Sequence, residues 1–303
     1  MLVGPTASGK TALALHLAEH LNGEIVSCDA VAVFRGLDIG SAKPTSAERA
    51  RVPHHSLDLL DPNQPTTAGD YARAARTALA EIQSRGHLPI VTGGSGLYLR
   101  ALLEGLAPAP PRNEALRQRL RLRSARSGPE HLHALLQRLD PAAAALIHPN
   151  DTPKLIRSLE VTVAARSPQT EQWQAGRDPL QGFRTLQLGL NPPRAALYAR
   201  INDRASRMFT HGLLEETAAL RTRFGDDCRA LTSLGYAQAL SVLRDDLPLE
   251  AAIAAAQQGH RNYAKRQLTW FRRDPNIHWL TGFGDDASVQ ASALALAQSH
   301  LHS

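Results

Sequence analysis

The eight residues from Gly4 to Thr11 constrain this chain more than any other stretch. They read Gly-Pro-Thr-Ala-Ser-Gly-Lys-Thr, a glycine followed after four residues by Gly-Lys-Thr. This spacing wraps backbone N–H groups around a phosphate, while Lys10 neutralises its charge and the Thr11 hydroxyl holds Mg²⁺. Leu2 and Val3 before the loop read as the end of a buried strand, and apolar residues after it have helical spacing. The sequence therefore predicts an α/β core with a phosphate site, and leaves open whether that phosphate belongs to a nucleoside triphosphate or to another diphosphate.

Charge is distributed unevenly along the chain. Residues 1–100 contain nine Lys and Arg and nine Asp and Glu, whereas the remaining residues contain 25 bases and 19 acids, so the net charge of +6 lies beyond residue 100. An arginine excess of this kind suits a polyanionic partner, because phosphate contacts supply most of the affinity in nucleic-acid binding. Solvated helix faces in an arginine-rich chain explain the same numbers. Charge alone leaves both interpretations open.

Length and composition limit the class of protein. A chain of 303 residues can form two domains or one large α/β unit with an insertion. No apolar run reaches the length of about 18 residues that a membrane-spanning helix needs, and no signal peptide fits before the loop. Cys28 and Cys228 are too few for a disulfide framework. We therefore expect a cytoplasmic protein without a membrane partner. Because a first strand needs about five or six residues, we also expect a few residues to precede Met1.

A carboxylate follows the next apolar stretch. Residues 24–28 read as a short buried strand that ends at Asp29. Ligands of open α/β sheets bind beyond the carboxyl ends of the strands, so Asp29 is expected beside the phosphate loop, where a group-transfer enzyme needs a base or an orienting acceptor. A turn or N-cap aspartate is the competing interpretation. Neighbouring His54 and His55 point apart on an extended backbone, which favours hydrogen-bonding roles over a shared metal.

Two further segments complete the first half of the predicted core. Apolar residues at helical spacing predict a helix over residues 67–84, ended by Gly86. A strand over residues 88–94 then runs into the glycine-rich stretch that begins at Gly93. An ordinary P-loop NTPase often closes such a strand with the aspartate that binds Mg²⁺. The Thr-Gly-Gly found here counts against a standard ATPase.

A helical block interrupts the α/β pattern. Three prolines between residues 108 and 111 mark a boundary, and the residues that follow lack strand signals. We predict an all-α helical insertion domain over residues 112–181, and an α/β core domain formed by residues 1–111 and 182–303. The helices expected in the insertion cover residues 116–122, 132–139, 142–147 and 155–165. Five arginines lie on and just after the first of them: Arg117, Arg119, Arg121, Arg123 and Arg126.

The core resumes with an alternating strand over residues 183–190, which two prolines end. The next helix carries three arginines on one face, spaced three and four residues apart: Arg200, Arg204 and Arg207. One of them can reach a diphosphate from the side opposite the loop lysine. An exposed basic stripe is the alternative.

Bases and aromatic residues alternate near the C-terminus. A turn at Gly235 and Tyr236 precedes a helix, and residues 261–273 combine arginines and a lysine with three aromatics at the end of the last long helix. Such a pattern grips nucleic acid by phosphate contact and base stacking, although the aromatics also suit a protein core.

Taken in order, these segments resemble the tRNA dimethylallyltransferases, also called tRNA isopentenyltransferases. Beyond the phosphate loop, the matching stretches are Asp38–Pro44, Pro53–His55, Gly93–Tyr98, His148–Asp151 and Ala264–Arg272. A phosphate loop occurs in many families, whereas this combination across nearly the whole chain is specific. The resemblance implies a P-loop NTPase-like parallel sheet core with an inserted helical domain.

The same resemblance implies a reaction. The loop binds the diphosphate of dimethylallyl diphosphate with Mg²⁺, in place of ATP, and the prenyl group goes to N6 of the adenosine at tRNA position 37, next to the anticodon. That adenine is flipped out of its stack into a channel that the donor enters from the other end. We expect a monomer, which is the simplest case for an enzyme that faces one tRNA.

Site residues follow from the resemblance position by position. Asp29 matches the general base at the adenine amine, and Thr6 and Arg204 match contacts to the departing diphosphate, whose charge such groups stabilise. The matching donor-binding residues are Gly4, Thr6, Ala7, Ser8, Gly9, Lys10, Thr11 and Arg204, with Thr11 at the metal. The matching tRNA-binding residues are Asp29, Ala30, Val31, Ala32, Ser95, Arg117, Lys154, Arg157, Gly235 and Tyr236.

The tRNA-reading positions depart from the family's pattern. After the aspartate the family usually has Ser, a variable residue, Gln and then often Tyr, where this chain has Ala30, Val31, Ala32 and Phe34. Two side chains expected to hydrogen-bond nucleotide are therefore absent. The usual Gln-Arg-x-x-Arg of the insertion is Pro-Lys-Leu-Ile-Arg, over residues 153–157. The prenyl-transfer residues match better than those that read tRNA.

Two other functions explain parts of the sequence. A small-molecule P-loop kinase, with ATP on the loop and Asp29 activating a hydroxyl, accounts for residues 1–100 but not for the arginine-rich insertion or the basic C-terminal helix. An RNA-binding protein with a vestigial nucleotide site has no need of Lys10, Thr11 and Asp29. The sequence favours prenyl transfer to tRNA.

Overall fold

A computed structural model describes residues 1–174 and 176–302 of the chain. It divides into two compact units, one formed by Met1–Leu103 with the segment from Gln181 onward, the other by Glu104–Leu180. The sequence placed the limits of the inserted unit at 112 and 181, so the structure adds the connecting segment before the first inserted helix. Within the described ranges, no helix is both long and apolar enough to cross a membrane.

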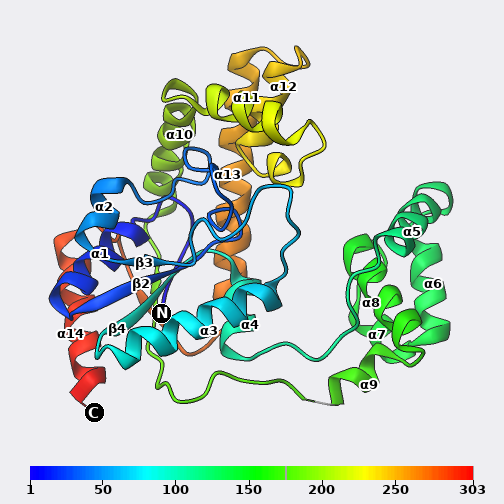
Figure 1. Cartoon of the computed structure of the whole chain (residues 1–303), viewed down its shortest axis with the longest axis horizontal. Coiled ribbons are helices and arrows are strands. Elements are labelled where there is room, and N and C mark those ends of the chain that lie inside the picture. Colours follow the sequence, from blue (N-terminus) through cyan, green and yellow to red (C-terminus); the bar gives the residue numbers. More distant parts are fainter. Residues whose placement is uncertain (175, 303) are drawn as a thin grey trace. The chain divides into compact units, whose positions relative to one another are not determined.

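Unit 1 is built on a six-stranded sheet with the order β3-β2-β4-β1-β5-β6, in which every neighbouring pair is parallel (Figure 1). The strands are β1 (Leu2–Val3), β2 (Gly23–Cys28), β3 (His54–His55), β4 (Leu88–Gly93), β5 (Gln187–Leu190) and β6 (Ile277–Leu280). Because β2, β4 and β1 are neighbours, the loops that follow them lie side by side at the carboxyl ends of the strands. Open parallel sheets bind their ligands at these carboxyl ends.

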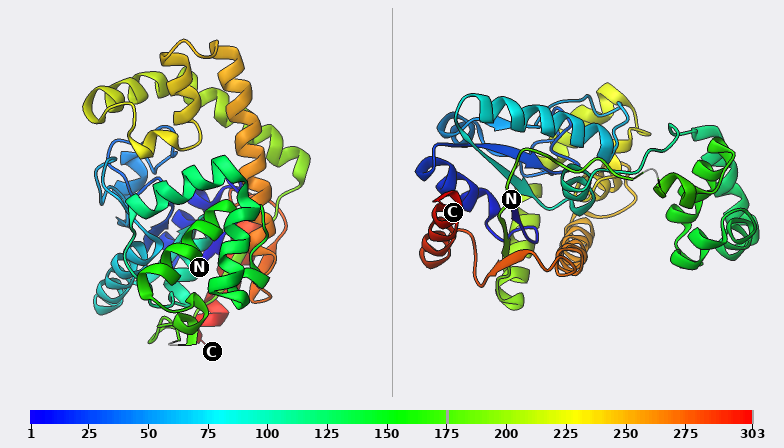
Figure 2. Two further views of the ribbon diagram at one scale, coloured as in Figure 1. Left: turned by 90° about the vertical axis from the view of Figure 1, so that its right-hand side faces the viewer. Right: turned by 90° about the horizontal axis from the view of Figure 1, so that it is seen from below.

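Helices cover both faces of the sheet. The helices before the insertion are α1 (Lys10–His20), α2 (Ser46–Arg51), α3 (Ala68–Ser84) and α4 (Gly96–Leu103). The C-terminal helix α14 (Ala287–His302) packs beside α1. Figure 2 shows α3, in cyan, on one side of the strands, and α1 and α14, in dark blue and red, on the other.

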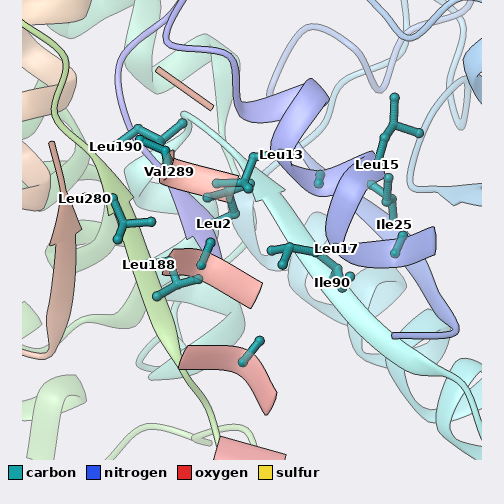
Figure 3. Packing of buried hydrophobic residues seen from close by; sticks show 14 of the residues in the cluster. Leu2, Leu13, Leu15, Leu17, Ile25, Ile90, Leu188, Leu190, Leu280 and Val289 are labelled. Atoms are coloured by element: carbon teal, nitrogen blue, oxygen red, sulfur yellow. The ribbon is translucent and has the colours of Figure 1, made fainter. Parts of the chain in front are cut away.

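The main core lies between the sheet and the pair α1 and α14 (Figure 3). Ile25 and Ile90 are registered partners on β2 and β4, and Leu13 and Leu17 of α1, one turn apart, pack against the same face. A fully buried aliphatic side chain contributes about 1.5–3 kcal/mol. The continuous apolar runs of these strands are typical of a parallel sheet that is covered on both faces.

The second half of unit 1 contributes a group of helices beyond the sheet edge (Figure 1). Its members are α10 (Arg194–Thr210), α11 (Leu213–Phe224), α12 (Tyr236–Leu243) and α13 (Leu249–Phe271), with a 3₁₀ turn at Arg229–Thr232. Leu197 and Ile201 of α10 pack with Ala264 of α13 and with Phe283. This contact fixes the rotation of both helices, and with it the direction of the polar residues one turn further along.

Unit 2 is all α, as the sequence predicted. Its helices are α5 (Glu114–Ser127), α6 (Pro129–Leu139), α7 (Pro141–Leu146), α8 (Thr152–Ala165) and α9 (Gln169–Gln174). They share a small core of buried side chains that includes Leu120, Leu132, Leu136, Leu155 and Leu159. Side chains of Asn113, Asp140 and Asp151 cap the N-termini of α5, α7 and α8, which supplies partners for free backbone N–H groups.

Some elements differ from their sequence predictions. The expected strand over residues 183–190 begins only at Gln187, and α9 and β6 were not predicted. The helix that ends near residue 271 was taken as the last long one, but α14 follows it. The hydrogen-bonding roles expected of the two histidines are confirmed: His54 Nδ1 lies 2.8 Å from the Val52 carbonyl oxygen and His55 Nε2 lies 2.5 Å from Glu24 Oε2.

Candidate active site

The predicted phosphate loop connects β1 to α1 and packs closely against the segment that follows β6. Ala7 and Gly9 have left-handed backbones, with φ of 62° and 86°. The carbonyl of Ser8 accepts a 2.9 Å hydrogen bond from the N–H of Gly284, in the segment that follows β6. A Cβ atom at Gly9 would lie 2.7 Å from the Gly284 nitrogen. Only glycine fits at this position, which is why the loop can pass so close to its support.

Lys10, the first residue of α1, folds its ammonium group over the loop. Its Nζ donates to the carbonyl oxygens of Pro5 and Gly4, at 2.7 and 3.1 Å. Burial lowers the pKa of Lys10 to about 7; the charge of Arg204 adds to this effect and that of Asp29 opposes it. An anion bound here would favour the charged form, because it supplies the counter-charge that the site lacks.

A cavity of about 190 Å³ opens at the carboxyl ends of the strands. Its walls come from the phosphate loop, the ends of β2 and β4, the loop 41–44, α10 and α13. Among the lining residues are Thr6, Lys10, Thr11, Asp29, Arg204 and Gln267. The three residues predicted to be catalytic, Asp29, Thr6 and Arg204, are therefore brought together.

Asp29 follows β2 directly and combines the two roles that the sequence left open. Its Oδ1 accepts hydrogen bonds from the N–H groups of Val31 at 2.8 Å and Ala32 at 3.1 Å, as a turn aspartate does. The same carboxylate lines the cavity, where its negative charge partly opposes the lowering of the Lys10 and Arg204 pKa values by burial. The Oδ1 atom thus fixes the orientation of the Asp29 carboxylate, and the carboxylate lies near the cationic side chains of Lys10 and Arg204.

Only one of the three arginines on the α10 face reaches the cavity. Arg200 pairs with Asp285 at 2.7 Å and Arg207 with Asp203 at 2.6 Å, both as exposed ion pairs. Arg204 instead lines the cavity, and burial lowers its pKa. It stands one turn beyond Ile201, whose packing against α13 turns this face toward the site.

The alanine-rich turn after Asp29 is held by its neighbours. The Ser95 hydroxyl, at the start of the turn after β4, accepts a 3.0 Å hydrogen bond from the N–H of Ala30. Ala32 is buried, and Ala30 and Val31 are half-buried. Because these three residues have no polar side chains, they can offer a ligand only backbone groups. Direct tRNA contacts by these residues stay a prediction.

The loop 38–44 is anchored by a buried lysine and by a carboxylate of α11. Lys43 has a side chain that is 1% exposed, and it donates to Asp58 at 2.6 Å and to Asp38 at 2.8 Å. Glu216 of α11 accepts from the N–H groups of Ile39, at 3.0 Å, and Gly40. Sequence analysis singled out this stretch as a motif without finding its role, because the anchoring residue Glu216 is remote in sequence.

The predicted tRNA contacts at Gly235 and Tyr236 need a correction for the tyrosine side chain. Tyr236 is 0% exposed. Its hydroxyl donates to Glu216 at 2.5 Å and accepts from the N–H of Gly40 at 3.1 Å. Burial raises the pKa of Tyr236, and the Glu216 carboxylate adds to the effect. In this conformation the tyrosine supports the loop 38–44 and presents no side-chain surface to tRNA.

The predicted tRNA-binding residues of unit 2 fall into two kinds. Arg117, 13% exposed at its side chain, and Arg157 share the buried carboxylate of Glu160, at 3.0 and 2.7 Å. Lys154 is 71% exposed and pairs with Asp151 at the surface. Arg117 therefore has a structural partner that the sequence did not reveal, whereas Lys154 is accessible.

Gln267 was missed by the sequence analysis. It stands within the stretch 261–273, which was read for its bases and aromatics, yet it is 5% exposed and lines the cavity. The only sequence signal for Gln267 was a single amide on the side of the helix that is buried. Its hydrogen-bond partners, Thr6 and Gly94, are too distant in sequence for a local pattern to indicate them.

Comparison with known proteins gives consistent matches along the chain. A family model described as "IPP transferase" matches residues 32–274, and one described as "Isopentenyl transferase" matches residues 1–61. The chain is 59% identical to a protein named tRNA dimethylallyltransferase from Koribacter versatilis over 99% of this chain and 97% of that one. It is 49% identical to the Solibacter usitatus protein of the same name, over 97% and 95%.

Solved structures also match over the full length. The tRNA isopentenylpyrophosphate transferase of Bacillus halodurans has a TM-score of 0.73 and 36% identity, and the alignment covers 99% of this chain and 95% of that one. A structure of a eukaryotic dimethylallyltransferase, described as acting on tRNA, has a TM-score of 0.79 and 26% identity, over 98% and 77%. Both matches cover unit 1 and unit 2 together.

Proposed function

Since this chain belongs to the tRNA dimethylallyltransferase family, we propose that it transfers a dimethylallyl group from dimethylallyl diphosphate to N6 of the adenosine at tRNA position 37, and releases diphosphate. One observation carries the proposal: the Asp29 carboxylate and the Lys10 and Arg204 cations line a single cavity beside the phosphate loop. A carboxylate for the amine and cations for the leaving group are the two parts that this reaction needs.

The donor half of the site is the phosphate loop with Lys10, Thr6 and Arg204. As the bond between the allylic carbon and the diphosphate oxygen breaks, its electron pair leaves with the diphosphate and negative charge grows there. Cations and loop N–H groups that are already in place stabilise this charge without reorganisation. Burial of Lys10 and Arg204 strengthens the effect, because electrostatic interactions are stronger where water is excluded.

The acceptor half is centred on Asp29. The exocyclic N6 of adenine attacks the allylic carbon and becomes positively charged, so it must lose a proton for a neutral product. Asp29 accepts that proton and orients the amine by the same hydrogen bond. Because Val31 and Ala32 already fix Oδ1, Oδ2 is the oxygen we assign to the substrate.

The residues present fit Mg²⁺ bound mainly through substrate. No group of three His, Cys, Asp or Glu side chains able to hold a metal occurs in residues 1–174 or 176–302, but the Thr11 hydroxyl lines the cavity beside the lysine. Magnesium usually keeps several waters and uses one or two protein ligands with substrate phosphates. Thr11 would hold the ion, which would neutralise charge on the diphosphate.

A tRNA whose anticodon is followed by adenosine is the proposed acceptor. The excess of bases beyond residue 100 suits its phosphates, and extrusion of the base brings N6 to the cavity. We propose that the enzyme acts as a monomer on one tRNA, in the cytoplasm.

The direct test is incubation with Mg²⁺, unmodified tRNA and labelled dimethylallyl diphosphate, beside a second tube with labelled ATP. Label entering tRNA from the prenyl donor, with mass and nuclease mapping that place it on N6 of adenosine 37, is the expected result. ATP turnover without prenyl transfer would establish the kinase in its place. A tRNA with guanosine at position 37 is the matched control and should take up no label.

A further inference from the structure

Gln267 links the two halves of the site through its side-chain amide. It lies on α13, is 5% exposed, and makes one hydrogen bond in each direction. Its Oε1 accepts from the N–H of Thr6 at 2.8 Å, and its Nε2 donates to the carbonyl oxygen of Gly94 at 3.0 Å. The partners define the orientation of the amide, because a backbone N–H requires the oxygen and a carbonyl requires the nitrogen.

Thr6 belongs to the donor half. Its N–H points at Gln267, so the hydrogen-bonding direction of this loop peptide is set by α13. Pro5 beside it has no N–H at all. The phosphate loop thus reaches its conformation with the help of a side chain 261 residues away.

Gly94 belongs to the acceptor half. The Ser95 hydroxyl next to it accepts from the N–H of Ala30, and the Ser95 N–H donates to the Cys28 carbonyl at 3.2 Å. These bonds join the turn after β4 to the turn that carries the catalytic carboxylate. A displacement of the Gly94 peptide is therefore transmitted to Asp29 through one short segment.

The approach of the amide to Gly94 leaves no space. A Cβ atom added at Gly94 would overlap Gln267 Nε2, and the nearest atom outside Gln267 would be the Gly4 carbonyl oxygen at 3.7 Å. Only glycine allows the contact while Gln267 is present. The same position tolerates a methyl group once the long side chain is removed.

We propose that Gln267 is a positioning residue for prenyl transfer, which sets the distance between the diphosphate cradle and the base by holding the Thr6 and Gly94 peptides with one amide. The role rests on the proposed function. Carbon–nitrogen bond formation needs the allylic carbon and N6 within about 3–3.5 Å, and a misplacement of about 1 Å can cost on the order of 100-fold in rate. A single short connection between the two halves is well suited to that requirement.

The first experiment compares Gln267→Ala with Gln257→Ala. Gln257 lies on the same helix and bonds the Ser206 hydroxyl and the Asn202 carbonyl, away from the loop and from Gly94. We expect Gln267→Ala to lower the single-turnover transfer rate by roughly 100-fold, with Kd values for tRNA and dimethylallyl diphosphate changed less than about threefold. Gln257→Ala should transfer at nearly the wild-type rate.

Gln267→Glu separates the two hydrogen bonds. The carboxylate keeps an acceptor for the Thr6 N–H but places an oxygen against the Gly94 carbonyl and a negative charge near the diphosphate. We expect it to transfer no faster than Gln267→Ala and to bind dimethylallyl diphosphate more weakly. A Glu variant with the wild-type rate would show that the bond to Gly94 is dispensable and would overturn the proposal.

A double-mutant cycle with Gly94→Ala gives an independent test. In the wild type the new methyl group must push the amide aside, so transfer should fall strongly. In the Gln267→Ala background the methyl group meets nothing closer than 3.7 Å, so it should cost little more. Additive effects of the two substitutions would contradict a shared contact.

The controls distinguish failure of this inference from failure of the proposed function. If wild-type protein does not prenylate tRNA, the function itself is wrong. If wild-type protein transfers and Gln267→Ala loses rate, tRNA affinity and thermal stability in parallel, Gln267 is merely structural and the inference is wrong. A rate loss without the other two supports it.

Discussion

Lys10 is the residue at which burial and function conflict most directly. A lysine without a full carboxylate partner loses part of its charge on burial, and its pKa falls to about 7. A bound anion would restore the charge of Lys10, because an opposite charge nearby favours the protonated form. The phosphate-loop pattern predicted the lysine and its purpose, but the lowered pKa follows from the burial of Lys10 and from the nearby charge of Arg204, which only the structure shows.

Donor binding should therefore take up a proton. Near pH 7 about half of the Lys10 groups in the free protein are charged, and bound diphosphate raises the pKa, so the affinity for dimethylallyl diphosphate should fall as pH rises from 7 to 9. The limit is about tenfold per pH unit. Calorimetry in two buffers of different ionisation enthalpy measures the protons directly. Lys10→Met serves as the control, because only the ligand's own ionisable groups contribute to its proton uptake. Equal proton uptake by the two proteins would contradict the assignment of the bound proton to Lys10.

Asp29 allows base chemistry to be separated from local folding. Asp29→Asn keeps an oxygen for the N–H groups of Val31 and Ala32 but cannot accept the proton, whereas Asp29→Ala loses both. We expect both variants to lower the transfer rate by about 10²–10⁴-fold, the range of general base catalysis. The tRNA Kd of the Asn variant should stay within about threefold of wild type. Filter binding and single-turnover assays on the same preparations measure the two effects; equal losses of both would remove Asp29 from the base role.

At the scale of elements, local sequence patterns predicted the helices, strands and loop whose conformation depends on neighbouring residues in the chain. The loop, β2, β4, α3, α10 and the first four helices of unit 2 all follow from apolar periodicity and caps. Sequence reasoning failed where long-range contacts decide: β3 and β6 are short strands that exist because β2 and β5 pair with them. Gln267 falls in the same class, since its hydrogen-bond partners are 261 and 173 residues away.

The Glu24 cluster on β2 ties three elements at one end of the sheet. Glu24 is 3% exposed at its side chain and accepts from Arg85, His55 and His87, which belong to the end of α3, to β3 and to the start of β4. Burial opposes its ionisation, but the hydrogen bonds outweigh burial and lower the pKa of Glu24 to about 2. The carboxylate holds the edge strand β3 against the sheet.

This cluster should set the acid limit of stability. Because the pKa of Glu24 is about 2 when folded and near 4.5 when unfolded, its contribution, on the order of 3 kcal/mol, is complete above pH 4.5 and is lost as pH falls toward 2. Urea unfolding at pH 7 and pH 3 measures it. The difference in stability between wild type and Glu24→Gln should shrink at pH 3, and an unchanged difference would contradict the assignment. Glu19→Gln, which breaks only an exposed pair with Arg51, should have little effect.

At the scale of the whole molecule, the two units differ in what they contain. Every residue that lines the cavity belongs to unit 1. Unit 2 carries basic side chains on a small helical core. Its predicted contacts were inferred from charge and resemblance, and charge alone does not separate an arginine that binds a phosphate from one that holds a fold.

Lys154 and Arg117 should respond differently to truncation. Lys154→Ala is expected to weaken tRNA binding and lower the slope of log Kd against log salt by about 0.7–0.9, one released counterion. Arg117→Ala leaves the buried Glu160 with one arginine, so it should mainly destabilise unit 2, by about 1–3 kcal/mol. Salt-dependent tRNA binding and thermal melting of each variant measure these effects. A reduced salt slope for Arg117→Ala without a change in melting would restore it as a phosphate contact.

The interruption of the sheet by unit 2 has a consequence for synthesis on the ribosome. The phosphate loop, Asp29 and Gly94 are made before the insertion, whereas β5, Arg204 and Gln267 come after it. At about 5–20 residues per second, β1 waits roughly 5–20 s after β4 for the partner of its other edge. During that time the nascent chain holds only the first part of the cavity lining and an inner strand with one unpaired side. The order of translation therefore delays the second half of unit 1. Until β5 is made, the free side of β1 is open to pairing with strands of other chains.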